Sequence, residues 1–338
     1  MNRDVGETKV ALPPETTCDV SVVIVSYNTR DITLRCVETV LASENVTIEV
    51  IVVDNCSSDG SAEALRAAFP GVAVIDSPRN GGFAFGNNIG FDRARGRYVL
   101  VLNPDTEVNG DTIARAVAYC DAHRDVGVLG CRVRYEDGTP QSTIIRYLSL
   151  TQLFGIVFVP SRILRRTPLF GDLRYAGLSR DAIHDVDAVA GCFMLVPRTV
   201  LEQVGGLDQR FFMYGEENEW CRRITRAGWI VRYNPEMEVM HLGAASTAHM
   251  SVWKAVEITR GHVLFLRFTR GPVIAWIGTL LMLLRDLRSA PWHLLRAMVR
   301  RTPDDAADRK AWRTRLGFLL KALVDQPKGQ TISRRCGA

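Results

Sequence analysis

The chain has 338 residues and eight cysteines, but no two of these cysteines form a C-x-x-C motif. Their irregular spacing excludes the usual zinc knuckles and short disulfide frameworks. Most of them lie inside apolar runs, as small buried side chains do in a reducing compartment. We therefore expect the cysteines to be part of the hydrophobic core.

A strong net charge is also absent, because the formal charge is only +5. This value gives no indication of nucleic-acid binding, and we expect no nucleic-acid partner. The sequence contains neither a G-x-G-x-x-G motif nor a Walker loop, which argues against a Rossmann dehydrogenase and a P-loop NTPase. The first 19 residues are polar and lack the apolar segment of a signal peptide, so we expect a cytoplasmic protein.

Short apolar runs alternate with helical patterns in the first part of the chain. The runs are rich in β-branched residues and cover residues 20–25, 48–55, 72–77 and 98–105. This alternation over about 110 residues predicts βαβ units and a parallel sheet. The expected fold class is α/β, with a Rossmann-like, mixed but mostly parallel sheet flanked by helices.

The expected organisation has three parts: a flexible leader at 1–18, the α/β domain at 19–250, and a helical, basic tail at 251–338 that associates with a membrane. The tail contains an uncharged apolar run of 14 residues, 271–284, with arginines on both sides. This run is shorter than the roughly 20 residues of a membrane-spanning helix. Either an interfacial helix in the lipid headgroup layer or a buried core helix would explain it.

Polar clusters follow three of the predicted strands, at 26–31, 54–58 and 103–105. In parallel sheets, ligands bind beyond the carboxyl ends of the strands, so the three clusters are expected along one edge. A loop rich in glycine and asparagine, residues 80–90, leads into a helix and permits close approach of the backbone to a ligand. Each cluster alone would also fit an ordinary solvated turn.

Asn103-Pro104-Asp105, directly after an apolar strand, is the strongest candidate for metal binding. Mg²⁺ and Mn²⁺ prefer carboxylate oxygens and bridge readily to a diphosphate. We expect Asp105 to be the metal ligand and Asn103 a weak or indirect one. His241 is a candidate second ligand through its neutral imidazole. Asn-Pro-Asp is also a common turn, and a lone histidine is more often structural.

The acidic cluster Glu216, Glu217 and Glu219 is a candidate for general-base catalysis. Neighbouring carboxylates raise one another's pKa, which brings one of them towards useful basicity near neutral pH. We assign that role to Glu217 and expect Glu219 to pair with Arg223 on a helix surface.

Five ordered segments together resemble family 2 glycosyltransferases of the GT-A fold, and among these the bacterial rhamnosyltransferase-like branch. The segments are SVVIVSYNTRD, VIVVDNCSSDGS, NGGFAFGNNIG, VLVLNPD and GGLDQRFFMYGEENEWCRR. The resemblance covers about residues 19–245, and the tail after residue 250 is only weakly covered.

The resemblance implies inverting, metal-dependent transfer of a hexose from a nucleoside-diphosphate sugar, with Mn²⁺ or Mg²⁺ as cofactor. It implies metal binding by Asp105 and a catalytic base at Glu217, with Glu216 as a rival because the family's usual E-D pair is Glu-Glu here. The family's D-x-D motif is N-P-D here, which leaves one carboxylate for the metal. The implied nucleotide-sugar pocket consists of Ser26, Tyr27, Asn28, Asp54, Asn80, Gly82, Asn103 and Asp105.

The favoured donor by resemblance is dTDP-rhamnose, followed by a UDP-sugar. The expected acceptor is a glycan or a polyprenyl-linked precursor of a cell-surface polysaccharide, met at the inner face of the cell membrane through peripheral contact of the tail. A non-catalytic sugar-nucleotide or glycan-binding module on the same fold is the alternative.

Overall fold

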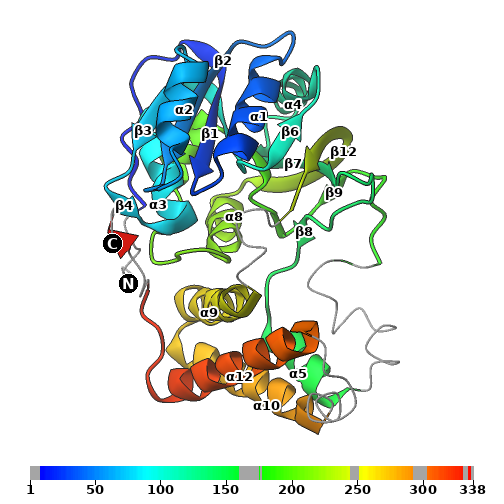
Figure 1. The fold of residues 1–338 in the computed structure, drawn as a ribbon. Helices are drawn as coiled ribbons and strands as arrows, with labels where there is room; N and C mark the ends of the chain where they lie inside the picture. Colours follow the sequence, from blue (N-terminus) through cyan, green and yellow to red (C-terminus); the bar gives the residue numbers. More distant parts are fainter. Residues whose placement is uncertain are drawn as a thin grey trace.

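A computed structural model describes residues 8–159, 175, 177–243, 251–291, 303–329 and 334–335. Figure 1 shows two parts: a twisted sheet with helices on both faces, and a cluster of helices below it. The loops that follow several strands of the sheet face this cluster.

The sheet has the strand order β3-β2-β1-β5-β11-β7-β12-β6, with β9 paired to β12. Its first half is parallel, as the apolar runs predicted. The strands of this half are β1 (Cys18–Ser26), β2 (Ile48–Asp54), β3 (Ala73–Asp76) and β5 (Gly96–Leu102).

The second half of the sheet mixes directions. Its strands are β11 (Phe193–Pro197), β7 (Val126–Arg134), β12 (Ile230–His241), β6 (Thr106–Val108) and β9 (His184–Asp185). Strand β11 is antiparallel to both β5 and β7, and β7 is parallel to β12. Strands β6 and β9 are both antiparallel to β12. Two small pairs lie outside the sheet: β8 (Ile144–Ile145) with β10 (Ala188–Val189), and β4 (Arg79–Asn80) with β13 (Arg334–Arg335).

Helices cover both faces of the sheet because successive strand side chains point to opposite sides. On one face, the side chains of Val22 and Ile24 pack with α1 (Arg30–Leu41), α2 (Ser61–Ala68) and α4 (Thr112–Ala122). On the other face, Val23 packs in a core that includes α3 (Gly82–Phe91), α7 (Arg198–Val204) and α8 (Glu216–Arg226). The expected α/β fold with a helical C-terminal appendage is confirmed.

A third hydrophobic core holds the helical part together. It is formed by α5 (Leu150–Phe158), α9 (Ser251–Arg270), α10 (Pro272–Arg288) and α12 (Pro303–Val324). The apolar run 271–284 lies in α10, which buries Ala275 and Met282 but leaves Val273 and Trp276 exposed. The run thus has one buried face and one exposed face. No helix within the described ranges is long and apolar enough to cross a membrane.

Two further expectations can be compared with the structure. Residues 8–17, placed in the flexible leader, are hydrogen-bonded to the α/β part: the Gly206 N–H donates to the Thr8 carbonyl at 2.7 Å, and the Thr17 N–H to that of Arg95 at 3.0 Å. Among the described residues, six cysteines are free, and five of these are buried as small core side chains. Cys56 differs from the expectation because it takes part in a disulfide, which cysteine spacing alone did not indicate.

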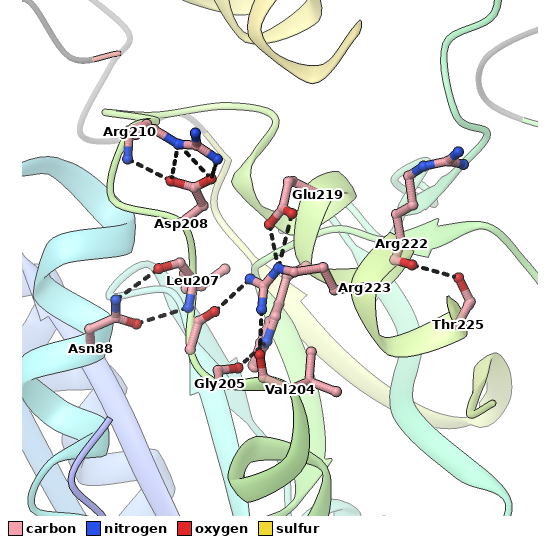
Figure 2. A network of polar contacts seen from close by, with 12 residues as sticks. Asn88, Val204, Gly205, Leu207, Asp208, Arg210, Glu219, Arg222, Arg223 and Thr225 are labelled. Atoms are coloured by element: carbon pink, nitrogen blue, oxygen red, sulfur yellow. Dashed lines mark hydrogen bonds and ion pairs between the residues drawn. The ribbon is translucent and has the colours of Figure 1, made fainter. Parts of the chain in front are cut away.

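A polar network fixes the start of α8 against the preceding loop (Figure 2). The Arg223 guanidinium donates from Nε to both carboxylate oxygens of Glu219 at 2.8 and 2.9 Å, so the expected pair is present, but Glu219 is buried and does not lie on the helix surface as predicted. Its other nitrogens donate to the carbonyls of Val204 and Gly206 at 2.7 and 2.6 Å. The Asn88 side chain holds the same loop by bonding both the N–H and the carbonyl of Leu207.

We expect Arg223→Met to lower the free energy of unfolding by about 3 kcal/mol, because it leaves the buried Glu219 carboxylate without its cation. Urea denaturation followed by circular dichroism measures this. The double variant Arg223→Met/Glu219→Leu removes both charges and should regain part of the loss. Equal stability of the single variant and the wild type would contradict the role given to this pair.

Candidate active site

A cavity of about 510 Å³ lies where the strand ends of the sheet meet the helical part. Its walls come from the ends of β1 and β5, the segment 141–148, the segment 212–218 that includes the start of α8, and one face of α9 from Trp253 to Phe265. Segments far apart in the sequence therefore surround one space.

The structure brings most of the predicted site residues to this cavity. Three of the predicted nucleotide-binding residues do not line it: Ser26, Asn28 and Asp54. The predicted residues that do line it are Tyr27, Asn80, Gly82, Asn103, Asp105, Glu216, Glu217 and His241.

The three residues outside the wall hold the loops that form it. The Ser26 hydroxyl is buried and lies 3.1 Å from the hydroxyls of Thr29 and Thr33. The Asn28 side chain accepts a hydrogen bond from the Ser58 N–H at 2.8 Å. Asp54 accepts from the Ser57 N–H at 2.9 Å, whereas its other carboxylate oxygen, Oδ1, is buried with no hydrogen-bond partner among the described residues.

Asp105 and His241 meet at one end of the cavity, although 136 positions separate them in the sequence. Asp105 Oδ1 lies 3.0 Å from His241 Nε2, and the Asn103 side-chain amide lies 3.2 Å from the same nitrogen. Asp105 is only 5% exposed. Both residues stand at neighbouring strand ends, since β12 pairs with β6 directly after Asp105.

Gln141 orients this histidine, a role that no sequence pattern indicated. Gln141 Oε1 lies 2.8 Å from His241 Nδ1, and its Nε2 donates to the His241 carbonyl at 2.5 Å. With Nδ1 donating to the amide oxygen, the lone pair of neutral imidazole is on Nε2, which faces Asp105. Gln141 therefore fixes the orientation of the ring, and Nε2 is the nitrogen that faces the cavity.

Glu216 and Glu217 begin α8 at another part of the cavity wall. Gly215 precedes them at φ +102°, and its N–H donates to Glu217 Oε2 at 3.0 Å. Burial raises the pKa of both carboxyls, and the neighbouring charge of Glu217 raises the pKa of Glu216 further. Glu216 is 3% exposed, and its Oε2 has no hydrogen-bond partner among the described residues. Such a pair has the raised basicity that a general base needs.

Helix α9 supplies a wall that the sequence interpretation missed. Trp253, Lys254, Ile258, His262 and Phe265 line the cavity from this helix. Lys254, Ile258, His262 and Phe265 recur at spacings of three to four residues, which is the signal of a helix face that could have identified them. Burial lowers the pKa of His262 to about 4, so this wall histidine is neutral at physiological pH.

The aromatic residues beside the acidic cluster divide into two roles. Tyr214 lines the cavity. Trp220 is fully buried and stacks on Phe91 with ring centroids 5.7 Å apart, so it packs in the core. Arg146, from the segment after β8, joins Lys254 as a cation in the cavity wall.

We expect Glu216→Gln to raise the melting temperature at pH 8, on the order of a few degrees, because it removes a buried charge. The raised pKa means that the folded state favours the protonated carboxyl. The gain in melting temperature should therefore shrink as the pH falls towards the ordinary pKa of glutamic acid, because the carboxyl is then protonated in both the folded and the unfolded state. Thermal denaturation across this pH range measures it, with the exposed Glu236→Gln as a control. A gain independent of pH would contradict the explanation.

Residues 21–187 match the model of the family described as Glycosyl transferase family 2. The chain is 42% identical over 106 residues to the succinoglycan biosynthesis protein ExoO of Rhizobium meliloti, a stretch that makes up 31% of this chain and 30% of ExoO. It is 28% identical over 219 residues to the N-acetylglucosaminyl-diphospho-decaprenol L-rhamnosyltransferase of Mycobacterium tuberculosis, covering 59% of this chain and 68% of that protein.

The fold is similar to that of the mannosyltransferase PcManGT from Pyrobaculum calidifontis, whose structure is a complex with GDP-Man and Mn²⁺. The TM-score is 0.53 at 17% identity, over 94% of this chain and 89% of the other. At this identity the similarity concerns the fold. With the sequence motifs, the GT-A-like sheet and the family match together, residues 21–187 of this chain belong to glycosyl transferase family 2.

Proposed function

We propose that this protein is an inverting glycosyltransferase that moves a sugar, with rhamnose favoured, from a nucleoside-diphosphate sugar to a glycan or lipid-linked acceptor in cell-surface polysaccharide synthesis. The main support is that the Asp105–His241 pair and the Glu216–Glu217 pair line one cavity. A donor diphosphate and an acceptor hydroxyl can then lie in the same enclosed space. The names of the relatives, a succinoglycan biosynthesis protein and a rhamnosyltransferase, support the same reaction class.

The donor nucleotide is assigned to the side of the cavity near Tyr27 and Asn80. Asn80 is held by the Asn55 side chain at 3.0 Å, and both line the cavity. The Asp54 oxygen Oδ1 has no hydrogen-bond partner among the described residues and lies outside the cavity lining. It can accept a hydrogen bond from a ribose hydroxyl or a base N–H of a nucleotide that extends past Tyr27 and Asn80. Gly82 has φ +81° and no room for a Cβ because of the Phe212 carbonyl, so its backbone alone forms this part of the wall. We favour dTDP-rhamnose as donor and UDP-sugars next.

Asp105 and His241 are the residues that fit a divalent cation. The donor set, one carboxylate oxygen and one imidazole nitrogen fixed by Gln141, suits Mn²⁺ and accommodates Mg²⁺ less well. Two protein ligands leave positions for diphosphate oxygens and water. When bound, such a cation stabilises negative charge on the departing diphosphate.

The acidic pair is assigned to the acceptor. The acceptor hydroxyl oxygen attacks the anomeric carbon from the side opposite the nucleoside diphosphate, and the Glu217 carboxylate takes the hydroxyl proton. The bond from the anomeric carbon to the diphosphate oxygen breaks, and the diphosphate leaves with the electron pair. This displacement inverts the anomeric configuration. The raised pKa of Glu217 increases its basicity, and Glu216 is the rival for the same role.

We expect release of the nucleoside diphosphate from one donor in a panel of dTDP-, UDP- and GDP-sugars, with Mn²⁺ or Mg²⁺ and a membrane lipid extract as the acceptor source. Asp105→Ala and Glu217→Gln should each lower kcat/KM by about 100-fold or more. Glu216→Gln run in parallel identifies which carboxylate is the base. Donor binding without release, unaffected by Glu217→Gln, would instead favour a sugar-nucleotide-binding module.

We expect Gln141→Leu to weaken Mn²⁺ binding by about tenfold or more, because the His241 ring loses the group that fixes it. Isothermal titration of Mn²⁺ in the presence of dTDP measures the affinity directly, without relying on turnover. Gln203→Leu, at an exposed position outside the cavity, is the matched control. Unchanged Mn²⁺ affinity in Gln141→Leu would rule out this role.

A further inference from the structure

The helical part carries an unusual amount of exposed apolar surface. Among the described residues, ten large apolar side chains are exposed, and seven of them belong to α5, α10 and α12. The most exposed are Val324 at 91% and Val273 at 70%. The other five are Phe154, Phe158, Trp276, Leu287 and Leu320. Isolated exposed apolar residues are common in soluble proteins, but a concentration on neighbouring helices marks an interaction surface.

Along α10 these side chains lie on one face. Val273, Trp276, Leu280, Leu284 and Leu287 recur at spacings of three and four, which places them within one narrow stripe of a helix. Leu280 and Leu284 are partly buried and continue the stripe between the exposed positions.

The opposite face of α10 packs towards α9. A Cβ added at Gly278 would meet the Leu266 side chain of α9, which shows how closely these helices approach. In Figure 1, α9 lies between the α/β part and the layer formed by α10 and α12. The apolar stripe is therefore on the side of α10 that faces away from α9.

The neighbouring helices widen this stripe into a surface. Trp276 Nε1 donates to the Leu323 carbonyl at 3.1 Å, which places the end of α12 with Leu320 and Val324 beside the start of α10. Arg288 donates to the Val157 carbonyl at 2.5 Å, which places the end of α5 beside the end of α10. We call the seven exposed residues on these three helices the outer apolar face.

Charge distinguishes the kinds of partner that fit this face. Residues 251–338 contain 17 of the 42 basic residues but only 6 of the 37 acidic ones, a net charge of +11 against −6 for residues 1–250. Lys321 and Arg313 are exposed on α12 near Leu320. A second copy placed symmetrically on this face would bring like charges together, whereas an anionic lipid surface would attract them.

We propose that the outer apolar face docks this protein on the surface of an anionic phospholipid bilayer. Val273, Trp276, Leu320 and Val324 insert between the lipid headgroups, and the surrounding basic side chains contact lipid phosphates. The helices lie in the interface and do not cross the bilayer. On this docking, and if the proposed function holds, α9 places the cavity one helix layer from the lipid, where a lipid-anchored acceptor is concentrated.

The test is sedimentation of the full chain with vesicles, without donor or acceptor, so it does not depend on catalysis. Vesicles of phosphatidylcholine and phosphatidylglycerol in equal parts are compared with vesicles of phosphatidylcholine alone. The docking variant is Val273→Gln/Leu320→Gln/Val324→Gln, because glutamine is compatible with a helix. The control is Leu41→Gln/Ile183→Gln, which alters similarly exposed apolar residues elsewhere.

We expect the wild type and the control to bind the anionic vesicles, with weaker binding at high salt, and the docking variant to bind about tenfold less tightly or worse. Circular dichroism confirms that the variants are folded. Three results would overturn the proposal: no binding of the wild type to anionic vesicles, equal binding of the docking variant, or a dimer in sedimentation velocity that only the docking variant abolishes.

Discussion

The ion pair between Arg223 and Glu219 links the fold to the candidate active site. It lies one turn behind the acidic pair, and the same guanidinium holds the carbonyls of Val204 and Gly206. The loop before α8 is thereby fixed at its start (Figure 2). Burying two carboxylates at a helix start costs free energy, so the surrounding structure must be held by groups whose own charges are paired. In this protein those groups are the Arg223–Glu219 pair and the loop carbonyls that Arg223 binds.

The cavity belongs to neither part of the molecule alone. The α/β part supplies the strand ends with Asp105 and His241, and the helical part supplies the α9 wall with Trp253 and Lys254. Burial between the two walls removes water from the Glu216 and Glu217 carboxyls, and this desolvation is the main cause of their raised pKa.

Much of the fold could be predicted from the sequence because strands and helices leave local periodic signals. The four apolar runs became β1, β2, β3 and β5, whereas the glycine-rich segment that was expected to be a loop before a helix is itself helical, as α3. The second half of the sheet was less predictable, because β11 enters antiparallel between β5 and β7 and no local pattern encodes strand direction. The apolar run 271–284 was ambiguous for a similar reason: its two faces have different surroundings, which hydropathy along the chain does not distinguish.

The alternating elements, the family resemblance and the chemical types of the candidate residues could be identified from the amino-acid sequence, since these depend on short-range pattern. Which of these residues share a cavity depends instead on the packing of distant segments. That packing placed Tyr27 in the wall but Ser26 and Asn28 behind it, and it brought Gln141 to a histidine 100 residues away. Contacts of this kind depend on how elements pack together, and burial by distant segments also sets the pKa values of the acidic pair.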